Sequence, residues 1–216
     1  MARAGRRHVL ESEGPDGFWH GRACYTSRVV SALDEATLRE PLRRALASRE
    51  PRRLPVGATT AAAVLLSLFE KEGETHLWLV RRPKSMRSHA GQVAFPGGKS
   101  DPADDSLMAT ALRETHEELG IARASVDVLG SLDDYVTITG FTISPCVGWL
   151  APDVQVRPNP SEVERAFAVP IRSFLEPATG ILPWRGWKVD GELVWGATAA
   201  IVRGFASIVR ALTADQ

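Results

Sequence analysis

The chain has 216 residues, 44% of them hydrophobic and 24% charged, which suits one large globular unit rather than a disordered chain. Lysine plus arginine and aspartate plus glutamate balance at 26 each, which argues against a generally basic nucleic-acid or membrane-surface binder. Any anionic ligand must therefore be held by a local cluster of charges.

The sequence favours a soluble, cytoplasmic protein. Cys24 and Cys146 form neither a CxxC pair nor a disulfide framework, as expected of reduced thiols in the cytosol. The apolar run at 61–69 ends at two charged residues, well short of the roughly 20 residues that span a bilayer. We expect a small-molecule ligand and neither a nucleic-acid nor a membrane partner; a homodimer is compatible with these residues, which do not determine the oligomeric state.

The first part of the chain carries few functional signals. Residues 1–30 show no clear period, and residues 31–48 favour a helix that is capped by Ser31 or Asp34 and broken or restarted at Pro41. We interpret the arginines of this region as a solvated face rather than a phosphate site; they are Arg39, Arg43, Arg44, Arg49, Arg52 and Arg53. Prolines at 51 and 55 mark a linker, which divides the chain into an N-terminal extension, 1–55, and a main domain, 56–216.

The main domain mixes strands with helices. Apolar runs at 58–69 and 76–82 flank a charged turn and predict a hairpin, and residues 92–95 predict a short strand that leads into glycines. Further strands are predicted at 125–135, 141–149, 162–169, 182–189 and 192–195, the last two joined by an Asp-Gly turn. Apolar residues recurring at three and four predict a closing helix at 197–212. These elements indicate a layered α/β fold.

The segment 95–121 has the features of a metal site. Good helix formers run from Ser106 to Leu119, and Gly120 stands where a terminating glycine is expected. One arc of this helix carries Glu114, Glu117 and Glu118, and the neighbouring arc, expected to pack, carries Met108, Leu112, Thr115 and Leu119.

Three carboxylates close to the C-terminal end of a helix repel one another and the helix dipole. A divalent cation that prefers oxygen ligands, Mg²⁺ or Mn²⁺, would neutralise them and could hold a phosphate. The alternative interpretation is a solvated acidic face.

The surrounding residues favour the metal site. Arg-Glu-Thr-His-Glu-Glu-Leu-Gly-Ile at 113–121, after Pro-Gly-Gly, resembles the signature of the Nudix hydrolases. The sequence departs from that signature at Thr115, where an aliphatic residue is usual, at Asp105, which replaces the first glutamate, and in the spacing from Gly98 to Asp105, which is one residue longer. Residues 82–98 resemble the upstream extension found in the coenzyme A pyrophosphatase branch, and the whole resemblance runs from about 64 to 209.

The resemblance implies the Nudix fold, a mixed curved sheet sandwiched between α-helices, and metal-dependent hydrolysis of a diphosphate. For this branch the substrate is coenzyme A or acyl-CoA, cleaved to 3′,5′-ADP and (acyl) 4′-phosphopantetheine. The implied metal ligands are Glu114, Glu117, Glu118 and a carbonyl of Gly98, with Gly97 as its neighbouring alternative.

The remaining implied roles are catalysis and substrate binding. Arg113 orients the first carboxylate, and Glu117 is a third ligand or the base. Glu162 either binds a metal or accepts the proton of the attacking water, or it is only an exposed glutamate at the start of a strand. Glu164, two positions on along the same expected strand face, could be confused with it. Implied substrate contacts in the preceding loop are Arg82, Arg87, His89 and Gln92.

Two other functions remain open: a Nudix pyrophosphatase for another nucleoside diphosphate derivative, such as ADP-ribose or NADH, and a non-catalytic nucleotide-binding domain. Retention of Arg113 together with all three helix glutamates argues against the second.

Overall fold

The fold is built around one mixed β-sheet. The computed structural model describes residues 33–55, 59–85, 89–179 and 185–214, so predictions for the N-terminal residues, Cys24, Arg87 and 182–184 lie outside it. The strands of the sheet are β1 (Thr60–Lys71), β2 (Glu74–Arg81), β3 (Val93–Ala94), β4 (Gly97–Lys99), β5 (Val126–Ser131), β6 (Tyr135–Val136), β7 (Phe141–Leu150) and β8 (Arg165–Pro170).

The central strands follow the order β3-β2-β1-β7-β5, while β4 pairs with β1, β6 with β7 and β8 with β2. Strands β1 and β7 are parallel, and the other pairs in this sheet are antiparallel. A separate hairpin joins β9 (Trp187–Val189) to β10 (Glu192–Val194), as the turn at Asp190-Gly191 predicts.

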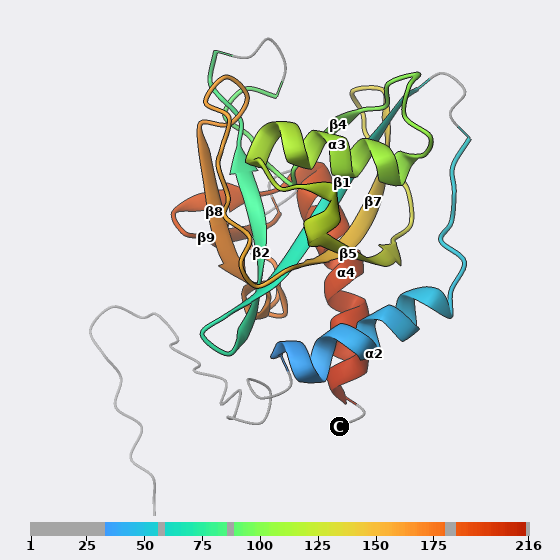
Figure 1. Ribbon diagram of the computed structural model, residues 1–216, viewed down its shortest axis with the longest axis vertical. Coiled ribbons are helices and arrows are strands. Elements are labelled where there is room, and N and C mark those ends of the chain that lie inside the picture. Colours follow the sequence, from blue (N-terminus) through green and yellow to red (C-terminus); the bar gives the residue numbers. More distant parts are fainter. Residues whose placement is uncertain (1–32, 56–58, 86–88, 180–184, 215–216) are drawn as a thin grey trace, which may run out of the picture.

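Helices cover both faces of the sheet. In Figure 1, α3 (Leu107–Leu119) crosses in front of the strands and α4 (Gly196–Ala214) runs behind them. Side chains of β1 alternate accordingly: Ala63 and Leu65 share a buried cluster with α3, whereas Leu66 and Leu68 join the larger core that includes α4. This arrangement is the predicted mixed sheet between helices.

The predicted central helix is confirmed. Ser106 caps α3 by accepting the Ala109 N–H, and Gly120 ends it with a left-handed φ of 69°. Thr115, at the aliphatic position of the motif, is fully buried and its hydroxyl donates to the Ala111 carbonyl. The hydroxyl is therefore satisfied within the helix and is compatible with a packed position.

Three predictions about the other elements are wrong in detail. Helix α2 (Glu35–Ala47) continues through Pro41 instead of breaking there, because Leu38 and Leu42, on either side, are both anchored in the core. The strand expected at 125–135 is two strands, with an irregularity in register between Val128 and Gly130. The strand expected to begin at Glu162 begins at Arg165.

The arginines near α2 are more ordered than a solvated face. Arg39 and Arg43 both pair with Asp127 of β5. Further along, Arg49 pairs with Asp133, and Arg53 pairs with the buried Asp134 at 2.8 Å. These contacts fasten the N-terminal segment to the sheet, although Arg44 remains exposed.

Helix α4 is long and apolar enough, by length and composition alone, to be a candidate membrane span. Its apolar residues are instead accounted for by the core: Ala199, Val202, Phe205 and Val209 are at most 1% exposed. On the other face of the sheet, burial raises the pKa of the Cys146 thiol to about 11, which keeps it protonated and unreactive.

We expect Leu42→Ala to destabilise the whole protein by roughly 2–5 kcal/mol, because it removes a fully buried side chain from the shared core. Chemical denaturation followed by far-UV and tryptophan signals measures this, with exposed Arg44→Ala as control. A loss confined to α2, with an unchanged main transition, would contradict the inclusion of α2 in the core.

Candidate functional site

Two glycines let the backbone of β4 pass unusually close to its neighbours. Gly97 pairs with Val64 of β1 at a φ of 153°, and a Cβ there would lie 2.3 Å from the Ala63 carbonyl oxygen. A Cβ on Gly98 would lie 2.4 Å from a carboxylate oxygen of Glu114. The glycines therefore allow Glu114 to lie directly against the β4 backbone.

Glu118 is a buried carboxylate, only 2% exposed. Its Oε2 accepts a hydrogen bond from the Gly97 N–H at 3.1 Å, and its Oε1 lies 3.6 Å from Nη1 of Arg82. Burial raises the pKa of Glu118 to about 8, since these two positive groups offset only part of the desolvation and Glu114 and Glu162 add repulsion.

Arg113 connects the acidic loop to the helix glutamates. Its Nη1 donates to Glu114 at 2.9 Å and to Glu117 at 3.0 Å. Its Nε and Nη2 form a two-point contact with Asp104, each at 3.0 Å, and Nη2 also donates to the Lys99 carbonyl. The guanidinium thereby ties β4, the loop and α3 together.

Asp104, rather than Asp105, is the loop carboxylate that Arg113 binds. Asp104 also accepts from the Thr110 hydroxyl and the Asp101 N–H, and the Arg113 contact holds its pKa well below the usual range. Asp105 is exposed. The spacing from Arg113 in the sequence points to Asp105. In the structure, the tight turn at 101–104 directs the side chain of Asp104, one residue earlier, toward Arg113.

The other two helix glutamates differ in exposure. The side chain of Glu114 is 16% exposed, and its pKa is raised by burial, with Arg113 opposing the shift and Glu117 and Glu162 adding to it. The side chain of Glu117 is 45% exposed. The glutamates thus share an arc, but Glu118 belongs to its buried side and Glu117 to its solvent side.

The loop before β8 caps the C-terminal end of α3. The Asn159 N–H donates to the Glu118 carbonyl at 2.9 Å, and the Arg157 N–H donates to the Leu119 carbonyl at 2.8 Å. These bonds satisfy carbonyls that a helix end leaves free and bring Glu162 close enough to act electrostatically on Glu114 and Glu118.

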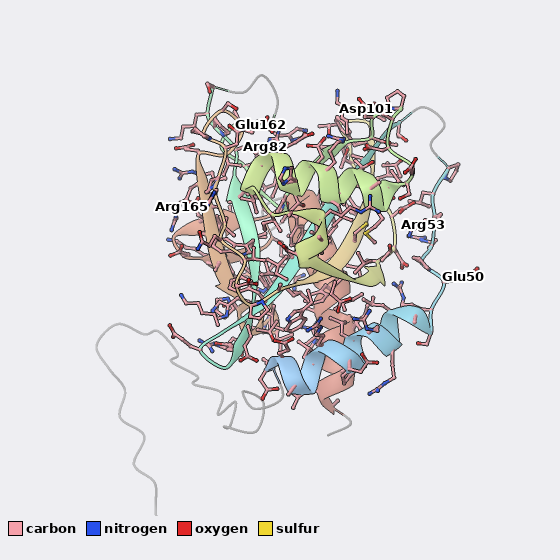
Figure 2. All side chains as sticks on the ribbon, in the orientation of Figure 1. Glu50, Arg53, Arg82, Asp101, Glu162 and Arg165 are labelled. Atoms are coloured by element: carbon pink, nitrogen blue, oxygen red, sulfur yellow. The ribbon has the colours of Figure 1, made fainter. Side chains whose placement is uncertain are left out.

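Glu164 has a different environment from Glu162. It pairs with Arg81 at 2.7 Å, whereas Glu162 is bonded to the Asn159 amide at 3.4 Å and shares the end of α3 with Arg82 in Figure 2. The two glutamates do not share a strand face, because Glu162 lies in the turn before β8.

The loop that precedes the glycines supplies further polar groups. The backbone of Arg82 pairs with Gln92 and Gly91, and Nδ1 of His89 lies 2.9 Å from Oε1 of Gln92. The His89 ring lies edge-on to the Phe141 ring, with 6.3 Å between the ring centres. Arg87, the fourth predicted substrate contact, lies outside the described residues.

Lys99 and Phe141 belong to this neighbourhood but were not predicted. Nζ of Lys99 lies 5.6 Å from the centre of the Phe141 ring, so a cation and an aromatic ring adjoin the His89–Gln92 pair. The only sequence signals were a lysine directly after Gly97-Gly98 and an aromatic residue directly after the Thr139-Gly140 turn.

The donor set fits a divalent cation. Within the described residues no three His, Cys, Asp or Glu side chains are gathered as a ready-made metal site, and the helix carboxylates contact Arg113, Arg82 and the Gly97 N–H. However, the charged forms of Glu114 and Glu118 are disfavoured by burial and mutual repulsion, and a cation would relieve both. Glu114 and Glu118 are the best-placed ligands, with the adjoining β4 backbone beside them.

Comparison with known proteins identifies the family. The NUDIX domain family matches residues 58–189. A Photorhabdus laumondii protein described as an uncharacterized Nudix hydrolase NudL is 41% identical over 159 residues, covering 69% of this chain and 84% of the relative. A Yersinia enterocolitica protein of the same description is 39% identical, covering 68% and 80%.

A solved structure supports the fold. The crystal structure of RenU, a Nudix hydrolase from M. Smegmatis, has a TM-score of 0.51 and 18% identity, covering 73% of this chain and 87% of that one. The family match and the NudL relatives, rather than the fold alone, identify a Nudix hydrolase, an enzyme that acts on pyrophosphate bonds. The chain belongs to the Nudix family.

We expect Asp104→Asn to lower kcat for diphosphate hydrolysis by about tenfold or more, because it loosens the guanidinium that holds Glu114 and Glu117. The matched control is Asp105→Asn, which changes an exposed neighbour and should retain activity within about twofold. Steady-state kinetics of both variants at saturating Mg²⁺ measure the difference, and equal losses would contradict the Asp104 assignment.

A second expectation concerns stability without metal. The folded-state pKa of Glu118, about 8 against an ordinary 4.5, means that the folded protein binds this proton more tightly than the unfolded chain. This proton contributes to the free energy of unfolding. The contribution is fully present below pH 4.5 and is lost as the pH rises toward 8.

Glu118→Gln should therefore stabilise the metal-free protein at pH 8.5 by on the order of 1 kcal/mol or more, and by much less at pH 5. Denaturation of both proteins in EDTA at these pH values tests this. If Glu118→Gln is less stable than the parent protein at pH 8.5, the buried charge of Glu118 does not destabilise the folded state.

Proposed function

We propose that the protein is a cytoplasmic coenzyme A diphosphatase that hydrolyses coenzyme A or its thioesters to 3′,5′-ADP and 4′-phosphopantetheine or the acylated form. The observation that carries the proposal is the 82–98 segment. It is similar to the coenzyme A branch in sequence, and its Arg82 side chain adjoins Glu118 of the candidate metal site. The NudL relatives are uncharacterized and support the family rather than this substrate.

In the proposed reaction, water adds across the P–O–P linkage: one phosphorus gains the hydroxyl and the other phosphate leaves with the bridging oxygen. Glu114 and Glu118, with Glu117 and the Gly98 carbonyl, would hold Mg²⁺ or Mn²⁺, which neutralises the diphosphate and acidifies bound water. Glu162 accepts the proton of the attacking water; its proximity to both glutamates supports this role.

Positive groups around the carboxylates would hold the phosphates. Arg82 presents paired donors for phosphate oxygens once the cation replaces it as the partner of Glu118. His89 and Gln92, which contact each other, and Lys99 beside Phe141 offer further polar contacts along the same loop. Arg113 positions Glu114 and Glu117 without touching the substrate.

We expect Glu114→Gln and Glu118→Gln each to lower kcat at limiting Mg²⁺ by about a hundredfold or more, because each removes a charged ligand with little change in volume. Metal affinity, measured by calorimetry, should fall in parallel. Near-normal turnover in both variants would exclude the helix carboxylates from the mechanism.

Glu162→Gln should reduce kcat more strongly than Glu164→Gln, since Glu164 is already paired with Arg81 on the neighbouring strand. The same kinetic assay compares the two variants. A larger loss of kcat in Glu164→Gln than in Glu162→Gln would contradict the assignment of Glu162 as the base.

Substrate preference is tested by kcat/KM for coenzyme A, dephospho-coenzyme A, ADP-ribose and NADH at one Mg²⁺ concentration. We expect coenzyme A to be preferred and dephospho-coenzyme A to be weaker, because it lacks the 3′-phosphate. A tenfold preference for ADP-ribose or NADH would replace the coenzyme A assignment with the broader nucleoside diphosphate one while leaving the chemistry intact.

A further inference from the structure

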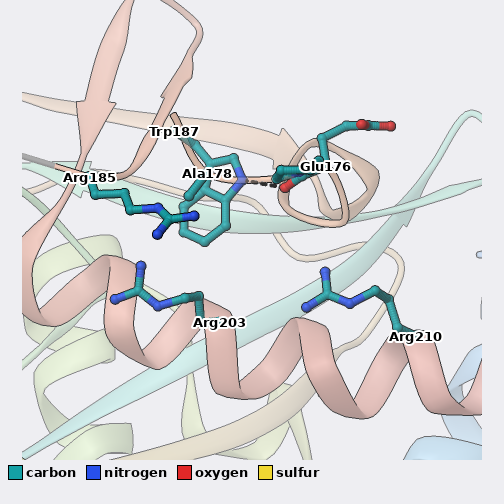
Figure 3. Close-up of a pocket in the computed structure, with 7 residues that line it drawn as sticks. Glu176, Ala178, Arg185, Trp187, Arg203 and Arg210 are labelled. Atoms are coloured by element: carbon teal, nitrogen blue, oxygen red, sulfur yellow. Dashed lines mark hydrogen bonds between the residues drawn. The ribbon is translucent and has the colours of Figure 1, made fainter. Parts of the chain in front are cut away.

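A second group of arginines lies on the opposite side of the molecule from α3. A cavity of about 390 Å³ is bounded by α4 and by the segment that leads into β9. Its lining includes Arg185, Arg203 and Arg210, together with Trp187 and Glu176. Figure 3 shows Arg203 and Arg210 on the face of the helix that looks toward the Trp187 segment, with Arg203 facing Arg185 and Arg210 facing Glu176, while Arg185 reaches toward the Trp187 ring from the other side.

The position of these arginines follows from the helix and the hairpin. Arg203 and Arg210 are seven residues apart, two turns of α4, and therefore lie on one face about 10 Å apart along the axis. Trp187 is buried, and its indole N–H donates to the Glu176 carbonyl at 2.9 Å. The backbone of Thr179 pairs with that of Gly186 in both directions, which fixes the residue next to Arg185.

The charge of this group is uncompensated within the described part of the chain. None of the three arginines there has a carboxylate partner, and Arg210 donates only to the Leu175 carbonyl, at 3.2 Å. Glu176 is exposed, and its carboxylate points away from Arg185 and Arg203 in Figure 3. Many of the other described arginines are paired with carboxylates; these include Arg39, Arg43, Arg49, Arg53, Arg81, Arg113, Arg165 and Arg172.

We propose that Arg185, Arg203 and Arg210 form a second anion-binding site, separate from the hydrolytic one, for a phosphate-bearing small molecule. Guanidinium forks match the paired oxygens of a phosphate. All three side chains are exposed, so solvent screens their mutual repulsion, and an anion in the cavity would be attracted by their combined charge. The volume falls within the range of small-molecule sites. A diphosphate, with two phosphoryl groups, matches arginines that lie two helical turns apart better than a single carboxylate does.

The site lies on the α4 side of the sheet, whereas Glu114 and Glu118 lie on α3, on the other side. Binding there should therefore not require the divalent cation of the hydrolytic site. This difference lets a single experiment separate the two sites.

The test is calorimetric titration of the full chain with inorganic pyrophosphate, in EDTA and without divalent cations. We expect one saturable site whose affinity falls about tenfold or more in Arg203→Gln and in Arg210→Gln. The matched controls are Arg44→Gln, which removes an exposed arginine from α2, and Arg82→Gln, which removes the arginine of the hydrolytic site. Both should keep the affinity within about twofold.

Thermal unfolding of each variant checks that the substitution leaves the fold intact. Repeating the titration with inorganic phosphate and with AMP then shows whether the cavity also takes an organic group. Two results would overturn the proposal: no saturable binding of pyrophosphate to the parent protein, or binding that Arg82→Gln abolishes while Arg203→Gln and Arg210→Gln retain it.

Discussion

The burial of the Glu118 carboxylate is the constraint on which the site depends. Placing a carboxylate at 2% exposure is unfavourable unless polar or charged groups replace water. The Gly97 N–H and Arg82 do this only in part, since the pKa remains raised. Glu118 depends on three features of its surroundings. Strand β4 pairs closely with β1, glycines permit this close approach, and the arginine of the adjoining loop lies beside the carboxylate.

Arg113 performs the complementary task on the solvent side of α3. It joins Asp104 and the Lys99 carbonyl to Glu114 and Glu117, so one side chain connects the loop, β4 and the helix. In the structure Arg113 pairs with Glu114 and Glu117, and Glu118 lies beside Arg82. Each acidic residue of this group on α3 is therefore matched with an arginine.

The sequence predicts the parts of the molecule that local signals determine. A few neighbouring residues are enough to predict three features: the caps of α3 at Ser106 and Gly120, the Asp190-Gly191 turn and the apolar period of α4. All three are confirmed. The choice between Asp104 and Asp105 depends on the direction of a turn, and the path of α2 through Pro41 depends on tertiary packing that outweighs a helix breaker. Spacing alone could settle neither.

Contacts between residues far apart in the sequence could not be predicted from it either. Asp127 and its arginines are more than 80 residues apart, and the three arginines lining the α4 cavity come from two segments with no shared motif. The resemblance to Nudix hydrolases identified the chemistry of α3, but it offered no information about a cavity on the opposite face. The sheet therefore separates a carboxylate-rich region that suits a cation from an arginine-rich region that suits an anion.

The most direct test of the central claim is a crystal structure grown with Mn²⁺, with anomalous scattering used to locate the ion. We expect an anomalous peak with carboxylate oxygens of Glu114 and Glu118 about 2.0–2.3 Å away, and Arg82 released from Glu118. A peak at the Asp101–Asp105 loop instead, with Glu118 still bound to Arg82 and the Gly97 N–H, would contradict it.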